Sequence, residues 1–275
     1  FTAPTHPTNP ITRQTATVLW NRSITPAVFR IGLSCQTGYA HAIAGQFVMV
    51  RPAGQVTPLL GRPFSIYSLV RNSGEVTGIE LLIKVAGKGT GRLSGLKEGA
   101  PVSLLGPLGN GFDIHLNDDR AFLVAGGIGV APLVFLAETM IAGGFPARQC
   151  ELFFGGRSAD DLQGCDRLSR MDMPVHRVTE DGSAGKTGRV TSRVTEIMTV
   201  RRPDRIYACG PWAMLGALAG IAESAGIPCQ VSVETMMGCG MGVCLSCVVH
   251  TRDPAVPYRH VCTDGPVMDS RLIQF

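Results

Sequence analysis

The stretch RAFLVAGGIGVAPLVFLAETMIA, residues 120–142, divides the chain into two kinds of structure. Arg120–Val124 is a short apolar run, a glycine cluster follows it, and Ala131–Ala142 has a helical pattern. Residues 121–137 are almost as long as the shortest membrane-spanning helices. Because they contain three glycines and a proline, we interpret them as a buried strand, a glycine loop and the start of a helix.

The part of the chain after this stretch alternates strands with helices. Apolar runs predict strands, and longer periodic runs predict helices. The expected strands are 150–154, 175–178, 205–208 and 229–234, and the expected helices are 188–199 and 212–225, with a weak helix signal at 158–170. This alternation predicts a parallel, doubly wound α/β sheet.

The part before it has short strand-like runs between Gly and Pro turns, with no long helical pattern. The runs are 17–20, 27–33, 46–50, 64–70, 78–85 and 101–104. They predict a small antiparallel β-barrel. The last 40 residues are rich in Gly and Cys and show little periodicity, so we expect a metal to organise them. We therefore predict a barrel at 12–112, an α/β domain at 113–230 and a C-terminal subdomain at 231–275, preceded by a polar tail at 1–11.

Composition excludes several classes of protein. The chain has 275 residues, 45% apolar and 17% charged, which is typical of a globular protein. Its net charge of +4 comes without a basic run, so we expect no nucleic-acid partner. FTAPTHPTNP at the N-terminus shows no secretory signal. Nine cysteines, five of them scattered singly, fit a reducing compartment and a metal site. We expect a cytoplasmic protein without a membrane partner.

Four cysteines crowd together near the C-terminus. Cys239, Cys244 and Cys247 have the spacing C-x4-C-x2-C, and Cys262 follows after fourteen intervening residues. Four thiolates at this spacing are typical of a plant-type [2Fe–2S] cluster. Neighbouring glycines would let backbone amides point at the sulfurs: Gly238, Gly240 and Gly242. A structural zinc site and disulfides are the alternatives, although zinc motifs usually pair all four cysteines.

Three segments of the barrel have features of a phosphate or nucleotide site. Arg62–Ser65 (RPFS) places a cation and a hydroxyl on one strand, and Arg matches phosphate with a fork of donors. Lys84–Gly91 (KVAGKGTG) ends a strand and could expose backbone amides at the start of a short helix. Gly106–Phe112 (GPLGNGF) predicts a rigid turn that closes the barrel. Alone, Arg62 could equally be a surface residue beside a core phenylalanine.

Two turns of the α/β domain suit a dinucleotide. Val124–Pro132 follows a strand and starts a helix, although its glycines do not have the G-x-G-x-x-G spacing, and a plain tight turn is the alternative. Cys209-Gly210-Pro211 repeats this arrangement, with Cys209 either a core thiol or part of a nicotinamide pocket. Glu180-Asp181 could accept from a ribose hydroxyl and favours NAD, whereas Arg157 could pair with a 2′-phosphate.

In this order, the motifs resemble those of flavin reductases of the ferredoxin–NADP reductase superfamily. The stretch from Cys239 to Pro266, ending VCTDGPV, is especially similar to the electron-transfer subunit of two-subunit, NAD-linked dihydroorotate dehydrogenases. The resemblance spans roughly residues 15–270. One departure is Lys84-Val85, where an aromatic–Arg pair is expected.

The resemblance implies an antiparallel FAD-binding barrel, a doubly wound NAD-binding domain and a small [2Fe–2S] subdomain. It implies that a nicotinamide exchanges a hydride with FAD and that FAD exchanges single electrons with the cluster, without an acid–base side chain. The implied residues for FAD and NAD(H) are Arg62, Pro63, Phe64, Ser65, Lys84, Gly87, Gly89, Thr90, Gly127, Gly129, Pro132, Cys209 and Gly210. Ser65 and Cys209 are candidates for a catalytic role near the flavin.

The resemblance also implies an FMN-containing dehydrogenase subunit as partner, in a heterotetramer that serves pyrimidine biosynthesis. An alternative is the small subunit of a ferredoxin-linked NADH/NADPH transhydrogenase or of a hydrogenase. Four cysteine ligands disfavour the transhydrogenase, where an Asp is expected at one position. A zinc-stabilised binding module is a third hypothesis.

Overall fold

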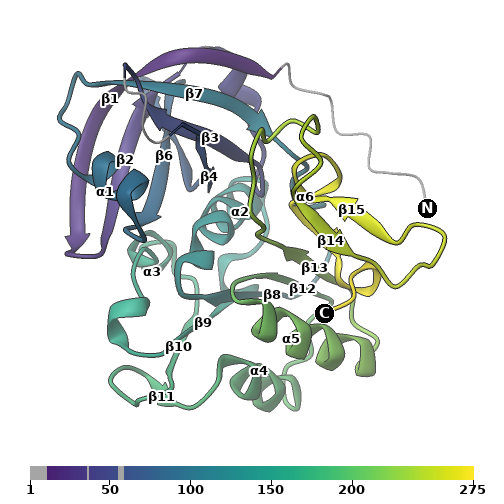
Figure 1. Cartoon of the computed structure of the whole chain (residues 1–275). Helices are drawn as coiled ribbons and strands as arrows, with labels where there is room; N and C mark the ends of the chain where they lie inside the picture. Colours follow the sequence, from purple (N-terminus) through teal and green to yellow (C-terminus); the bar gives the residue numbers. More distant parts are fainter. Residues whose placement is uncertain (1–10, 36, 55–58) are drawn as a thin grey trace.

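The computed structural model describes residues 11–35, 37–54 and 59–275 (Figure 1). A β-barrel, purple to blue in Figure 1, lies against an α/β domain, and the yellow C-terminal segment contacts both. Apart from Ile11, the predicted tail at residues 1–11 lies outside the described residues. No helix in the described chain is long and apolar enough to cross a membrane.

The predicted antiparallel barrel is confirmed. Its sheet has the order β4-β3-β7-β1-β2-β6-β5, and every neighbouring pair is antiparallel. The strands are β1 (Thr12–Thr25), β2 (Val28–Ser34), β3 (Phe47–Pro52), β4 (Arg62–Ser65), β5 (Ser68–Asn72), β6 (Glu75–Lys84) and β7 (Pro101–Leu108). The helix α1 (Lys88–Ser94) follows β6, as the glycine-rich segment predicts.

The barrel closes where β4 continues into β5. Ile66 N donates to Gln46 O (3.0 Å), and the next residue, Tyr67, donates from its N to Glu80 O (2.9 Å). Successive residues of a strand present their backbone groups to opposite sides. The run expected as one strand at 64–70 therefore forms two strands that reach both edges of the sheet.

The α/β domain has the expected parallel sheet, in the order β11-β10-β9-β8-β12-β13-β16. Its strands are β8 (Ala121–Gly126), β9 (Cys150–Gly156), β10 (Val175–Thr179), β11 (Lys186–Thr187), β12 (Arg205–Cys209), β13 (Cys229–Ser232) and β16 (Val267–Asp269). Its helices are α2 (Val130–Ala142), α3 (Asp166–Ser169), α4 (Val190–Met198) and α5 (Trp212–Ser224). Only β16 runs antiparallel within this described sheet.

Strand β8 shows why this region reads as a continuous apolar run. Leu123 and Ala125 face the core that the sheet shares with α2 and the barrel. Phe122 and Val124 face the second core, which contains buried residues of α4 and α5. A parallel strand covered on both faces needs apolar residues at every position.

The C-terminal segment returns to the sheet instead of standing apart. It contains the hairpin β14 (Val248–His250) and β15 (Tyr258–His260), then α6 (Val261–Asp264) and β16. Its buried residues, including Val249 and Met268, belong to the same core as the sheet. β13 spans the predicted boundary between residues 230 and 231. Because β16 has three residues, its sequence is too short to show a period.

Candidate cofactor sites

The four clustered cysteines lie close to one another. Cys244 interacts with Cys239, and Cys262 interacts with both Cys247 and Cys239. Cys247 and Cys262 are buried, whereas Cys244 is exposed. A two-iron cluster is held by four thiolates, so four neighbouring cysteines suit it. Among residues 11–35, 37–54 and 59–275, no three His, Cys, Asp or Glu side chains are placed to share a single metal ion.

Backbone amides point at these sulfurs, as the glycines predict. Met241 N and Cys244 N donate to Cys239 Sγ, each at 3.4 Å, and Gly242 N donates to Cys262 Sγ at 3.2 Å. Such N–H···S contacts stabilise thiolates and tune a cluster's potential. The loop therefore fits a group that carries negative charge on its sulfurs.

The surroundings of Cys244 and Cys262 shift the pKa values of the two thiols in opposite directions. The Ser246 hydroxyl, 3.2 Å from Cys244 Sγ, and its backbone lower the pKa of Cys244 to about 6. Burial raises the pKa of the Cys262 thiol to about 12, and the nearby Cys247 adds to this effect. A bound metal deprotonates its thiol ligands, so metal binding would have to remove the proton from Cys262.

Close packing fixes the cysteine loop against the barrel. A Cβ on Gly240, which has φ +75°, would lie 2.7 Å from Cγ of Met49 in β3. The predicted turn at Gly106–Phe112 also docks here, because Asn110 N donates to Gly265 O at 2.6 Å. The loop therefore sits where the barrel and the C-terminal segment meet.

A cavity of about 330 Å³ lies between β4, β6 and the end of β13. Of the residues predicted to hold FAD, six are in its wall: Arg62, Pro63, Phe64, Ser65, Lys84 and Thr90. Gly87 and Gly89 are not in the wall. The Thr90 hydroxyl is engaged with the backbone, because it accepts from Gly87 N at 3.1 Å. It thus stabilises the turn into α1.

Two polar groups beside this cavity suit a bound flavin nucleotide. The Arg62 guanidinium is exposed and donates to the carbonyls of Leu60 (3.1 Å) and Gly61 (3.3 Å), which leave its charge uncompensated. Thr235 Oγ1 is buried and has no hydrogen-bond partner among the described residues. A buried hydroxyl costs free energy unless something satisfies it. The residues present therefore fit FAD.

Lys84, one of the residues predicted to bind a cofactor, is paired with a carboxylate. Its ammonium lies 2.8 Å from Asp161 Oδ1, on the α/β domain, and lowers the pKa of that carboxyl. Lys84 lines both this cavity and the next one. The Lys84 ammonium thus forms an ion pair between the barrel and the α/β domain.

A larger cavity, about 640 Å³, lies at the carboxyl ends of β8, β9 and β12, where doubly wound sheets bind ligands. Gly127, Gly129 and Gly210 line it, as predicted. Gly127 has φ +53° and nothing within 4 Å of its Cβ position, whereas a Cβ on Gly129 would lie 2.4 Å from Cys209 O. Glycine at 129 therefore allows the two turns to touch.

Two of the residues predicted to lie by the nicotinamide cofactor are outside the cavity walls. Pro132 is buried in α2, and Cys209 is buried at the end of β12. Burial raises the pKa of the Cys209 thiol. In this structure Cys209 is a core thiol, and its role beside a nicotinamide stays a prediction.

Sequence reasoning missed the residues that join the two cavities. Ile128 and Glu234 line both, and burial raises the pKa of the Glu234 carboxyl although its side chain remains open to the cavity. Met237 lines the smaller cavity, two residues before Cys239. The available signal was the position of Glu234 at the carboxyl end of a strand.

Comparisons with known proteins agree with this arrangement. Family models match an oxidoreductase FAD-binding domain at 20–112, an oxidoreductase NAD-binding domain at 123–219, and the iron–sulfur cluster binding domain of dihydroorotate dehydrogenase B at 234–274. The electron transfer subunit of dihydroorotate dehydrogenase B (NAD(+)) from Caldanaerobacter subterraneus subsp. tengcongensis is 37% identical over 261 residues, which cover 94% of this chain and 98% of the relative. The chain belongs to this family.

Other relatives support the same conclusion. The dihydroorotate dehydrogenase B electron transfer subunit of Desulforamulus reducens is 37% identical over 230 residues, covering 83% of this chain and 86% of the relative. A solved NADH-dependent reduced ferredoxin-NADP oxidoreductase has a TM-score of 0.80 and 26% identity, over 95% of this chain and 90% of its own. This dihydroorotate dehydrogenase B electron-transfer chain thus has FAD-binding, NAD-binding and iron–sulfur domains, as predicted.

Proposed function

We propose that this chain moves electrons between NAD(H) and a partner dihydroorotate dehydrogenase subunit through FAD and a [2Fe–2S] cluster. The order of the sites in space supports the proposal. The dinucleotide cavity and the smaller cavity share Lys84, Ile128 and Glu234, and the smaller cavity ends at Met237 beside the cysteine loop. A dinucleotide, FAD and an iron–sulfur cluster bound at these three sites would therefore lie next to one another, in that order.

The chain's own residues would bind and orient these groups. When bound, FAD supplies hydride exchange with a nicotinamide and single-electron exchange with the cluster. Arg62 would pair with the FAD phosphates, and Ser65 and Thr235 would face the flavin. The glycines of the Gly126–Gly129 turn would let the dinucleotide approach the backbone. Cys239, Cys244, Cys247 and Cys262 would hold the two irons.

The wall of the larger cavity supports NAD as the dinucleotide. Glu180 lines this wall, where it could accept from a ribose hydroxyl and repel a 2′-phosphate. The Asp181 carboxylate accepts from Ser183 instead. The charge of Arg157 is partly compensated, because its Nε lies 3.6 Å from Asp161. Arg157 lines the same wall, but with its charge partly compensated, Glu180 favours a ribose without a 2′-phosphate.

The partner would dock beside the cysteine loop. The loop exposes large apolar side chains to solvent: Met236, Met241, Val243 and Leu245. The Met236 side chain is 90% exposed. Exposed groups of large apolar side chains are typical of an interaction surface. An FMN-containing dehydrogenase subunit is the proposed occupant, in a hetero-oligomer. Four thiolate ligands require reducing conditions, which supports a cytoplasmic location.

The test is anaerobic reconstitution with the partner. The chain, loaded with FAD and iron–sulfur, should bleach its flavin absorbance on addition of NADH, and the complex should reduce NAD⁺ with dihydroorotate. Electron transfer to ferredoxin is measured in parallel, because it distinguishes the ferredoxin-linked transhydrogenase from the proposed function. If the complex transfers no electrons from dihydroorotate to NAD⁺ but reduces ferredoxin, the proposed function is wrong.

A further inference from the structure

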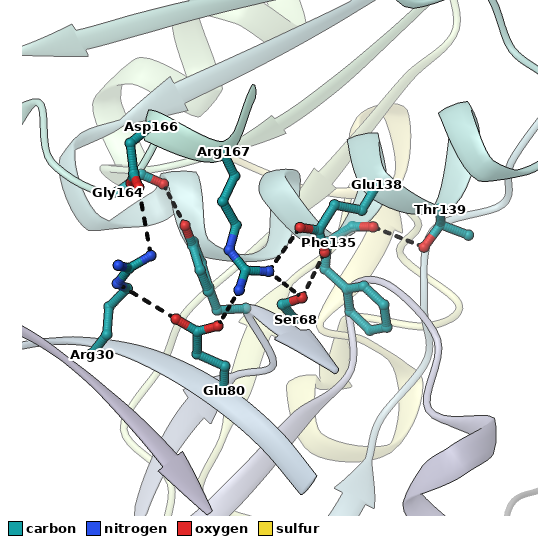
Figure 2. A network of polar contacts seen from close by, with 10 residues as sticks. Arg30, Ser68, Glu80, Phe135, Glu138, Thr139, Gly164, Asp166 and Arg167 are labelled. Atoms are coloured by element: carbon teal, nitrogen blue, oxygen red, sulfur yellow. Dashed lines mark hydrogen bonds and ion pairs between the residues drawn. The ribbon is translucent and has the colours of Figure 1, made fainter. Parts of the chain in front are cut away.

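Arg167 forms the centre of a polar network between the barrel and the α/β domain (Figure 2). Its Nη2 lies 2.7 Å from Glu80 Oε2 in β6. Its Nη1 lies 2.9 Å from Glu138 Oε1 in α2 and donates to Ser68 Oγ in β5 at 2.7 Å. Ser68 Oγ also donates to Glu138 Oε2 at 2.6 Å. One side chain of α3 thus joins two barrel strands to α2.

Two further contacts join the barrel to the α/β domain near α3. The buried Tyr67 donates from its hydroxyl to Gly164 O at 3.0 Å, and Arg30 Nη1 lies 3.7 Å from Asp166 Oδ2. Gly164 is held close, because a Cβ there would lie 2.4 Å from Leu82 Cδ2. The segment before and within α3 is therefore bonded to the barrel at several points.

Breaking the contacts of this network costs free energy, because they include a buried carboxylate. Glu80 is 2% exposed, and burial raises its pKa while Arg167 and Arg30 oppose that rise. A buried carboxylate that loses its cation is left as an uncompensated charge. The contacts therefore favour one relative position of the two domains over others.

The elements that meet in this network also form the cofactor cavities. Residues 155–169 begin in the wall of the dinucleotide cavity, at Gly155 and Arg157, and end at α3. On the barrel side, Ser65 lines the flavin cavity, and Ser68 of the following strand joins the network. Arg167 itself lines neither cavity.

We propose that Arg167 is a positioning residue, which holds the dinucleotide domain against the barrel at the distance and angle that hydride transfer to the flavin requires. This inference rests on the proposed function, since it assumes a nicotinamide in the larger cavity and FAD in the smaller one. A misplacement of about 1 Å between reacting groups can cost up to a hundredfold in rate.

The test compares two variants of the FAD- and cluster-loaded complex. Arg167→Met removes these contacts and leaves the buried Glu80 carboxyl with Arg30 as its ion-pair partner, whereas Arg167→Met with Glu80→Gln also removes the carboxyl. Anaerobic stopped-flow gives the rate of flavin reduction by saturating NADH, and titration gives the NAD⁺ dissociation constant. Thermal unfolding and hydrogen–deuterium exchange of residues 66–72 are measured on the same samples. Arg148→Met, which breaks an exposed ion pair with Asp172, is the control.

The expected pattern separates positioning from stability. Both Arg167 variants should reduce flavin at least about tenfold more slowly, with an NAD⁺ dissociation constant within about twofold of the parent value, since the wall of the larger cavity is intact. The double variant should recover most of the lost melting temperature, yet still exchange faster at residues 66–72. The control should match the parent protein in every measurement.

Two results would overturn the inference. One is flavin reduction at the parent rate in Arg167→Met; the other is recovery of rate and melting temperature together in the double variant. Failure of the parent complex itself to be reduced by NADH would instead contradict the proposed function.

Discussion

Replacing Gly129 by Ala tests how the dinucleotide cavity is built. A Cβ at this position would lie 2.4 Å from Cys209 O and 2.8 Å from Gly210 N, both backbone atoms. Carbon and carbonyl oxygen normally approach no closer than about 3.3 Å, so the two turns would have to separate by roughly 0.9 Å. Gly129 has φ −61°, so this effect is steric and owes nothing to backbone strain.

The magnitude follows from the opposing effects. Overpacking of this kind lowers the free energy of unfolding by about 3 kcal/mol. The reduced conformational freedom of the unfolded chain raises it by less than about 1 kcal/mol. We therefore expect Gly129→Ala to lower the free energy of unfolding by about 2 kcal/mol. Because Gly210 lines the same cavity, NAD⁺ should also bind at least about tenfold more weakly, the equivalent of about 1.4 kcal/mol.

The assay is urea unfolding followed by the fluorescence of Trp212, which begins α5 directly after the displaced turn. A Trp20→Phe background leaves Trp212 as the sole tryptophan, since the chain has two. Gly220→Ala is the matched control: its Cβ meets nothing within 4 Å, so it should stabilise α5 by up to about 1 kcal/mol. Unchanged stability and unchanged NAD⁺ binding in Gly129→Ala would refute the steric argument.

Three other predictions follow from single contacts. Cys247→Ser should abolish the visible absorbance of the iron–sulfur cluster, whereas Cys165→Ser should retain it; a cluster that survives in the Cys247 variant would exclude this ligand. Thr235→Val should weaken FAD binding roughly two- to tenfold through a lost hydrogen bond, as measured by fluorescence titration of the apoprotein, and equal affinity would show that the hydroxyl does not meet the flavin. Burial raises the pKa of Glu151, but hydrogen bonding with His176 and the nearby arginines lower it more, so the folded-state pKa is depressed. Its contribution is therefore present above the unfolded pKa of about 4.3 and is lost as pH falls through the folded value. Glu151→Gln should lower stability by about 2 kcal/mol at pH 7, and urea unfolding should show this difference shrinking below about pH 4.3; a constant difference from pH 7 to 3 would contradict the assignment.

Local sequence was informative wherever one segment carries its own signal. The apolar run and glycine turn at 121–129 predict a strand followed by a helix, and β8 and α2 lie there. The barrel strands were predicted from short strand-like runs between Gly and Pro turns, and the C-x4-C-x2-C spacing indicated an iron–sulfur loop without reference to any contact. Each of these features depends on neighbours within a few residues.

Other features depend on residues far apart in the chain. The helix signal at 158–170 was weak because α3 has four residues, yet its Arg167 meets Glu80 and Ser68, 87 and 99 positions away. Glu234 had no motif, and its importance comes from lying where two cavities join.

The kinds of domain and their order follow from the amino-acid sequence alone, and four cysteine ligands are predicted from it, because periodicity and spacing are local properties of the chain. The tertiary structure adds that the four cysteines lie close to one another, that the Lys84 ammonium lies 2.8 Å from Asp161, and that Cys209 lies in the core. These outcomes depend on how the barrel, the α/β sheet and the C-terminal segment pack, and side-chain packing between distant segments leaves no period in the sequence.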